Sequence, residues 1–214
     1  MILVDNIVSK SILASVCIGI GGCISTICSS YIVSSLFIAA SIFICINLNL
    51  FTCKASILSD SSDVRRLLLV LILNLFAAFL FGFIVSYCDS AISTISDKIV
   101  NSYAEANVTS CMIKSFIMGF VIMLMMNVNT ANEKNCIIPL LVIFTAVYSS
   151  CYHCILDAFY YGASSEFYNH IGWYLLRLFI VIVFNFIGCN SYNLIVKKSF
   201  IYNRSDNFKG NIIV

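Results

Sequence analysis

Long apolar runs alternate with short polar stretches along almost the whole chain. A helix of roughly 20 apolar residues crosses the ~30 Å hydrocarbon layer of a bilayer. We therefore expect six transmembrane helices, at about 11–28, 32–58, 67–88, 113–131, 137–162 and 173–197. The longest polar stretch between them is 89–112, and no soluble domain is left over. The pattern predicts one all-α transmembrane channel domain over residues 1–198, followed by a short tail, 199–214.

Two of these runs are longer than a straight crossing needs, and both are interrupted by polar residues in their second half. The interruptions are NLNLFTCKAS (47–56) and SSCYHCILD (149–157). The third and sixth runs each contain an asparagine beside small residues, Asn74 and Asn185. This recurrence predicts a 3+3 inverted repeat with broken helices two and five. Irregular backbone at membrane depth is tolerated only where protein or a cavity surrounds it, so the breaks indicate a pore.

Composition excludes a soluble domain and several kinds of site. Of the 214 residues, 61% are hydrophobic and 10% charged, and the mean hydropathy is +1.00. The net charge of +2 comes with no basic cluster, so no nucleic acid partner is expected. Most of the 11 cysteines lie within the apolar runs, where cysteine behaves as a small apolar residue. Cys151, His153 and Cys154 lack a fourth ligand at a suitable spacing, so we expect no metal and no cofactor.

The distribution of basic residues predicts the orientation. With both termini in the cytoplasm, nine basic residues lie on the cytoplasmic side and three on the outer side. The outer three are Lys98, Lys114 and Arg177. Cytoplasmic loops are enriched in lysine and arginine, so the N and C termini are both predicted to be cytoplasmic.

His153 and Asp157 lie four positions apart within an otherwise apolar run. Ionisable groups at membrane depth are costly and usually mark a pathway for ions or protons. A histidine, with an ordinary pKa near 6.5, can offer a proton or a hydrogen bond to an arriving anion. Two states of Asp157 remain open. An ionised carboxylate would hold the imidazole protonated and repel anions, whereas a protonated carboxyl would act as a neutral hydrogen-bonding group.

Three segments resemble the motifs of one membrane protein family. They are NLFTCK (49–54), YHCILDAFY (152–160) and IVIVFNFIGC (180–189). The family's corresponding motifs are close to E-L-F-T-G-N, E-H-S-[VI]-A-N-M-[FY]-F and P-V-T-L-G-N-I-[IV]-G-G. In these segments the chain resembles the formate/nitrite transporter family, and the similarity spans nearly the whole chain. The resemblance implies an aquaporin-like fold, a homopentamer with one pore per subunit, and a bacterial inner-membrane location.

The resemblance also assigns roles to individual residues. His153 takes the place of the central pore histidine, Leu50 and Phe51 form an apolar constriction on the cytoplasmic side, and Thr52 faces the histidine. Asp157 stands where the family has asparagine, and Met118 stands where it has a basic residue. Lys114, together with Arg177, would attract anions to the outer mouth. Asn74, Asn185 and Gly188 are expected to pack helices, because asparagine bonds across helices and small residues allow close approach.

The expected function is transmembrane passage of a small monovalent anion or its conjugate weak acid, such as formate, nitrite or hydrosulfide. His153 would supply the proton or hydrogen bond. A non-conducting structural or regulatory paralogue is the main alternative, favoured by Met118, by Asp157 and by an apparently short fourth run. A neutral-solute pore is less favoured because the chain's one proline, Pro139, leaves no paired Asn-Pro-Ala boxes. An intramembrane enzyme is disfavoured because no oxyanion-hole motif accompanies Ser149, Ser150 and Cys151.

Overall fold

The computed structural model describes residues 2–50, 64–131 and 137–209, and within these ranges the chain is helical with no strand. The all-α prediction is confirmed. The elements are α1 (Ile2–Ile27), α2 (Tyr31–Asn47), α3 (Val64–Cys88), α4 (Ser90–Glu105), α5 (Val108–Ala131), α6 (Ile137–Tyr148), α7 (Cys154–Ala163), the 3₁₀ turn η1 (Glu166–Asn169) and α8 (Ile171–Lys209).

Four of the described helices are long and apolar enough to cross a membrane. The apolar spans are Ile7–Ile27, Arg65–Cys88, Val108–Met126 and Ile171–Tyr192. Two further apolar helices, α2 and α6, are shorter than a full crossing. On the long helices α3 and α8, many large apolar side chains such as Phe76 and Phe179 are exposed, as expected for contact with lipid. The chain is a multi-pass membrane protein.

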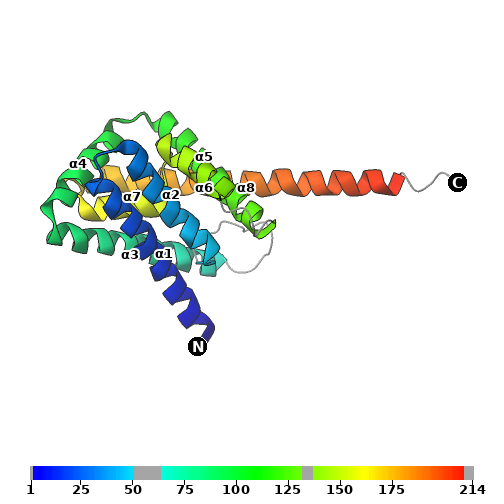
Figure 1. Ribbon diagram of the computed structural model, residues 1–214, viewed down its shortest axis with the longest axis horizontal. Helices are drawn as coiled ribbons and strands as arrows, with labels where there is room; N and C mark the ends of the chain where they lie inside the picture. The colour runs from blue at the N-terminus through cyan, green and yellow to red at the C-terminus, as the bar shows by residue number, and fades with distance from the viewer. Residues whose placement is uncertain (1, 51–63, 132–136, 210–214) are drawn as a thin grey trace.

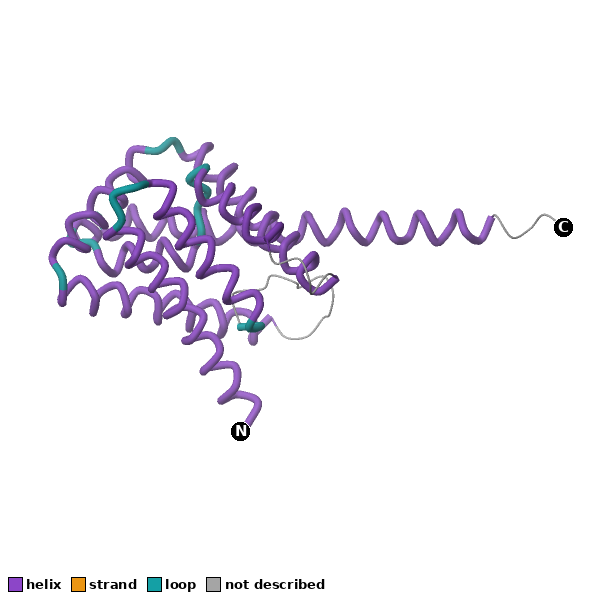
Figure 2. The backbone as a smooth tube through the Cα atoms, in the orientation of Figure 1, coloured by secondary structure: helices purple, strands orange, loops and turns teal. Residues whose placement is uncertain are grey.

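The helices form a bundle around α7 (Figures 1 and 2). All ten residues of α7 are buried, which makes this short helix the centre of the bundle. α3, α4, α1 and α8 pack against it. The N-terminal end of α1 and the second half of α8 project from the bundle (Figure 1).

The polar stretch 89–112 is not a simple connection, because most of it forms α4. Ile92, Ser96 and Val100 recur every four residues and form the buried face of this helix. Asp89 begins it, because its carboxylate accepts the backbone N–H of Ala91 at 2.9 Å. The following helix, α5, begins at Val108 rather than near 113, so the prediction of a short fourth span is wrong.

Two other boundaries differ from the predicted runs. The run 32–58 contains α2, which ends at Asn47, and its remainder from residue 51 lies outside the described residues. The run 137–162 contains two helices, α6 and α7, with residues 149–153 between them. α8 continues past the predicted end at 197 to Lys209, so residues 199–209 belong to this helix.

α2 and α6 end with the same backbone motif. Asn49 (φ 48°) and Ser150 (φ 56°) are the non-glycine residues with positive φ in the described ranges. The residue after each one donates its N–H to a carbonyl five residues earlier, Leu50 to Cys45 at 3.0 Å and Cys151 to Ala146 at 3.1 Å. This is the Schellman arrangement, which satisfies the last carbonyls of a helix while turning the chain away.

A second feature also occurs once in the N-terminal half of the chain and once in the C-terminal half. In α1, the Ser15 hydroxyl donates to the backbone carbonyl of Asn74 in α3 at 2.9 Å. In α8, the Asn185 amide donates to the backbone carbonyl of Ser115 in α5 at 2.7 Å. Each serine also donates its hydroxyl to the carbonyl four residues earlier in its own helix. A serine on one helix and an asparagine on another thus form a buried link in each half.

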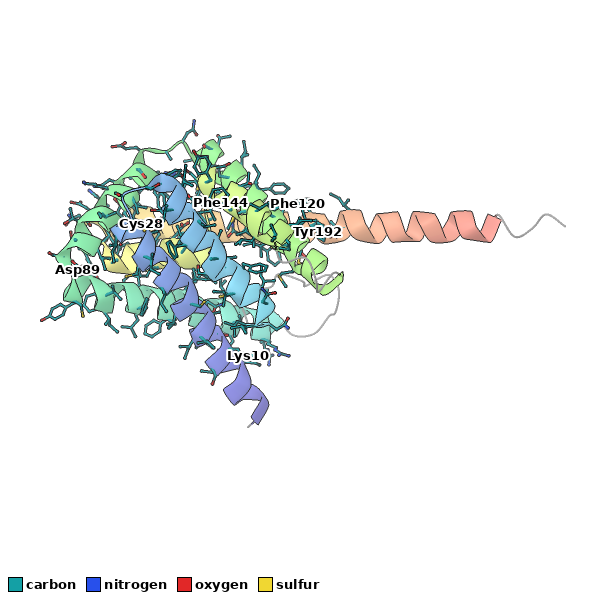
Figure 3. The ribbon with its side chains drawn as sticks, viewed as in Figure 1. Lys10, Cys28, Asp89, Phe120, Phe144 and Tyr192 are labelled. Atoms are coloured by element: carbon teal, nitrogen blue, oxygen red, sulfur yellow. The ribbon has the colours of Figure 1, made fainter. Side chains whose placement is uncertain are left out.

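Glycines allow two pairs of helices to approach closely. A Cβ on Gly82 of α3 would collide with the carbonyl oxygen of Phe159 in α7, and one on Gly162 of α7 would collide with that of Phe79. The crossing of α5 and α8 is reciprocal in the same way, through Gly119 against Asn185 and Gly188 against Phe116. Small residues at such crossings let backbones meet, so the predicted packing position of Gly188 is a point of backbone contact. Figure 3 shows Phe120 and Tyr192, whose rings lie 5.5 Å apart, on this same helix pair.

Candidate functional site

His153 begins α7 at the end of the α6–α7 break. Its backbone is extended (φ −125°, ψ 114°), and its Nδ1 accepts the backbone N–H of Leu156 at 3.4 Å, as an N-capping side chain does. The residue is only 4% exposed. Because Nδ1 is the acceptor, a neutral imidazole carries its hydrogen on Nε2 and can donate it to a group that approaches from that side.

Asn185 of α8 holds the backbone on both sides of His153. Its amide nitrogen donates to the carbonyl of Tyr152 at 3.0 Å, and its amide oxygen accepts the N–H of Cys154 at 3.3 Å. The same amide nitrogen reaches the Ser115 carbonyl in α5. These bonds pair backbone groups that the break removes from a helix, which would otherwise be costly inside a membrane protein. Asn185 therefore ties the histidine's segment to two transmembrane helices.

A cavity of about 540 Å³, which we call the vestibule, opens beside the break. Its walls are rich in hydroxyl groups from α1, α2, α4 and the break. The lining residues that bear hydroxyls are Ser25, Ser29, Tyr31, Ser34, Ser35, Ser102, Tyr103, Ser150, Tyr152 and Tyr160. Cys28, another lining residue, lies at the opposite end of α1 from Lys10 (Figure 3). The cavity can hold several water molecules or small polar solutes.

Lys114 is the charged residue among the described side chains that line the vestibule. Its Nζ lies 6.0 Å from the centroid of the Tyr152 ring, within the range of a cation–π contact. Tyr152 and Leu156 also line the cavity. His153 is not itself a lining residue, but it follows Tyr152 directly, and its Nδ1 accepts the backbone N–H of Leu156. The vestibule thus combines a positive charge with two lining residues, Tyr152 and Leu156, that adjoin the buried histidine.

Asp157, one helical turn after His153, is 1% exposed, and its Oδ2 has no hydrogen-bond partner among the described residues. Its carboxyl interacts with the side chain of Tyr103 in α4 and lies within Coulombic range of Arg177 in α8. In the described part of the chain, no interaction joins the carboxyl to the His153 imidazole. The arrangement gives no support to the hypothesis that Asp157 holds the imidazole protonated.

Arg177 does not lie at the mouth, contrary to the sequence-based expectation. It is 2% exposed, and its guanidinium donates to the carbonyl of Ala106 at 2.8 and 2.9 Å, just beyond α4. Its Cζ also lies 5.8 Å from the Trp173 ring. A cation at the C-terminal end of a helix satisfies free carbonyls and complements the helix dipole. Arg177 therefore joins α8 to the end of α4.

Asp97 joins α4 to the end of α7, outside the apolar spans. Its carboxylate accepts hydrogen bonds from the hydroxyls of Ser164 (2.6 Å) and Ser165 (2.9 Å) and from the N–H of Glu166 (3.2 Å). Partial burial works to raise the pKa of this carboxyl, but these hydrogen bonds outweigh it and lower the pKa below its ordinary value. The ionised form thus favours docking of α4 on the central helix.

The remaining sequence-predicted residues fall into two groups. Leu50 is buried in the core (4% exposed), and Met118 is completely buried among apolar neighbours. Asn74 is also completely buried, at the Ser15 link. Phe51 and Thr52 lie outside the described residues.

Sequence reasoning missed the residues that build the vestibule wall from α4 and α1. Tyr103 is the main example, because α4 itself was not expected. A signal was available: Ile92, Ile95 and Ile99 recur at helical spacing within the polar stretch. The serines of α1 and α2 carry no comparable signal, since a serine in an apolar run also satisfies its own backbone.

Comparison with known proteins supports the fold. No family model matches the chain, and no curated protein matches its sequence. Among solved structures, one described as a pentameric formate channel with formate bound matches with a TM-score of 0.73. The match covers 92% of this chain and 96% of that chain, at 15% sequence identity. The chain has the fold of a formate channel. This fold agrees with the resemblance of the three motifs to the formate/nitrite transporters.

Proposed function

We propose that the protein is a transmembrane pore for a small monovalent anion or its conjugate weak acid. We also propose that the substrate's path runs past the side chain of His153. The observation that supports this most is the position of the imidazole. It is buried at the start of α7, on a backbone held by Asn185, and it adjoins two residues, Tyr152 and Leu156, that line a hydroxyl-rich vestibule containing Lys114. An ionisable group in such a place inside a membrane domain is costly and is typical of a transport pathway.

The proposed topology has six crossings in a 3+3 inverted repeat with both termini in the cytoplasm. Two correspondences support the repeat: the matching ends of α2 and α6, and the matching serine–asparagine links of the two halves. In this scheme α6 and α7 are the two parts of broken helix five. The resemblance assigns Leu50 and Phe51 to a cytoplasmic constriction and Thr52 to the position that faces His153, although Phe51 and Thr52 lie outside the described residues.

The substrate class follows from the chemistry of the vestibule and the histidine. Lys114 raises the local concentration of anions. A bare anion cannot continue through apolar surroundings cheaply, since burying an unpaired unit charge costs many kcal/mol. When His153 has taken up a second proton from water, the imidazolium can give one proton to the anion of a weak acid and return to the neutral imidazole, so that the substrate becomes a neutral acid. Formate, nitrite and hydrosulfide are therefore suitable substrates, whereas anions of strong acids are not.

We further propose a homopentamer in a bacterial inner membrane, with one pore per subunit. The formate channel of the same fold is pentameric and holds formate. The exposed apolar residues of α3 and α8 provide surfaces for lipid and for neighbouring subunits.

Uptake into proteoliposomes tests the proposal. Formate, nitrite, hydrosulfide and glycerol are offered to the wild type and to His153→Ala and His153→Asn across pH 5–8. We expect anion uptake that rises as pH falls and drops at least tenfold in both variants. His153→Asn is the matched control, because asparagine still caps α7 but has no titratable group. A folded His153→Asn protein with wild-type uptake contradicts the proposed role of the imidazole.

The alternatives give different results in the same assay. A non-conducting paralogue passes none of the four solutes, although it is folded. A neutral-solute pore passes glycerol at a rate that depends on neither pH nor His153.

A further inference from the structure

We propose that Asp157 is a proton-operated gate for this pore, reached by protons from the vestibule through Tyr103. The inference rests on the proposed function and adds a regulation to it. In the protonated state the carboxyl is neutral and anions pass, whereas in the ionised state its charge opposes them. The resembling family carries asparagine here, so the gate would be a property of this chain.

The first support is that the carboxyl group is buried and incompletely hydrogen-bonded. Asp157 is 1% exposed, and its Oδ2 has no hydrogen-bond partner among the described residues. A buried carboxylate would normally be paired with a cation or fully hydrogen-bonded. Arg177 is within Coulombic range, but its guanidinium donates two hydrogen bonds to the carbonyl of Ala106, just after α4. The carboxyl is therefore placed to exist in a neutral state as well as an ionised one.

The second support is the connection to water. Tyr103 is half-buried, lines the vestibule and interacts with the Asp157 carboxyl. A phenol hydroxyl both donates and accepts a hydrogen bond, so it can pass a proton without changing its own charge. Its ring is also held edge-to-face by Tyr152, with centroids 5.0 Å apart. One side chain thus spans from the cavity to the buried acid.

Other groups around Asp157 set the electrostatic background. Interactions reach it from α4, α5, α7, α8 and the break. The titratable or charged groups concerned are Tyr103, Cys111, Tyr152, Tyr160, Tyr161, Arg177 and His153, the last of which reaches the carboxyl through its backbone N–H. The tyrosines and the cysteine are neutral near pH 7, so ionised Asp157 faces one cation. The gate's charge changes with a single proton.

The proton transfer balances as follows. A hydronium ion in the vestibule gives its proton to the Tyr103 oxygen while the Tyr103 hydroxyl proton moves to a carboxylate oxygen of Asp157. The products are water, an unchanged tyrosine and a neutral carboxylic acid. The reverse transfer returns the proton to the vestibule and restores the carboxylate.

The consequence for transport follows from distance. Asp157 lies one helical turn, roughly 5 Å, beyond His153 along α7. A unit charge at such a distance acts strongly on an anion in a medium of low dielectric constant. Ionised Asp157 therefore lowers anion passage even without touching the substrate, and passage follows the protonated fraction.

The test compares formate uptake by the wild type and Asp157→Asn at pH 5, 6, 7 and 8. The ratio of the two rates cancels protonation of formate itself. We expect the uptake rate of Asp157→Asn divided by that of the wild type to be near one at pH 5. At pH values above the midpoint for Asp157 ionisation, this ratio should rise by up to about tenfold per pH unit. Asp157→Glu should retain a pH-dependent ratio, and Tyr103→Phe should slow the response of uptake to a pH jump. A ratio that is the same at all four pH values overturns the gate.

Infrared difference spectroscopy separates this result from failure of the proposed function. Purified wild-type protein and Asp157→Asn are titrated over the same pH range. The carbonyl stretch of a protonated carboxylic acid should be lost as pH rises in the wild type and be absent from the variant. If this band is present in the wild type but no anion is taken up, Asp157 is a proton-binding site and the proposed pore function is wrong. Identical spectra for the two proteins overturn the inference whatever the uptake assay gives.

Discussion

The ends of α2 and α6 have the same backbone hydrogen-bond arrangement but differ in their side chains. After α2 the turn is Leu48-Asn49-Leu50, and Leu50 is buried in the apolar core. After α6 it is Ser149-Ser150-Cys151, and the last two residues line the vestibule. The same hydrogen bonds release the chain from a helix at both places. The comparison teaches that the two helix ends share one backbone geometry, whereas the side chains make one end apolar and the other polar.

The largest effect on stability is expected at Asn185, whose amide bonds the backbone between α6 and α7. Asn185→Leu leaves the Tyr152 carbonyl, the Cys154 N–H and the Ser115 carbonyl without this partner. Loss of these three hydrogen bonds, at ~0.5–1.5 kcal/mol each, should lower the unfolding free energy by about 3 kcal/mol. Denaturant titration in detergent checks this. Asn74→Leu, at the link of the other half, should cost less, and an equal cost would remove the proposed difference between the halves.

The next largest effect on stability is expected where α7 packs against α3. Gly162→Ala puts a methyl group against the Phe79 carbonyl of α3, so the helices must separate. Overpacking of this kind costs ~1–3 kcal/mol. We expect a lower thermal unfolding midpoint in detergent. Gly172→Ala is the matched control, since nothing lies within 4 Å of the added methyl. Equal midpoints for the two variants would show that α3 and α7 do not meet at this glycine.

Asp97 should make stability depend on pH below the physiological range. Its folded pKa is lowered, so its contribution is present above its ordinary value near 4 and is lost as pH falls through the folded value. The contribution is about 1 kcal/mol at most, because the group is only partly buried and its hydrogen bonds are screened by solvent. Thermal midpoints at pH 3–7 should converge for the wild type and Asp97→Asn at the acidic end. Parallel curves would contradict the role of the carboxylate.

The smallest effect concerns the two turns directly. A residue other than glycine at positive φ costs ~1–2 kcal/mol, and asparagine tolerates this region better than serine does. Ser150→Gly should therefore raise the unfolding free energy by up to about 1 kcal/mol, and Asn49→Gly should leave it nearly unchanged. The Ser150 variant is compared in a Tyr31→Phe background, because the two hydroxyls are 2.8 Å apart. A larger gain at Asn49 would reverse the expected order.

The membrane class and the all-helical fold could be predicted from the sequence because the apolar runs are long. The interruption at 149–157 was also visible, since polar residues such as His153 are rare in a span. α4 was missed because its apolar residues, such as Ile92 and Val100, are too few for a hydropathy signal and form a face rather than a run. Arg177 was misjudged because a basic residue near a predicted mouth does not reveal the carbonyls that it binds. Burial of polar groups depends on tertiary packing, which the pattern of one chain does not contain.

The central claim is that the vestibule is the entrance to a pathway past His153. Cys151 lines the vestibule at the break, and Cys28 is the other lining cysteine among the described residues. A bulky thiol-directed reagent is therefore applied to the Cys28→Ser protein in proteoliposomes, and mass spectrometry verifies that Cys151 is labelled. The account predicts that formate uptake falls at least tenfold on labelling and that Cys151→Ser in the same background is unaffected. Full labelling of Cys151 with unchanged formate uptake would contradict it.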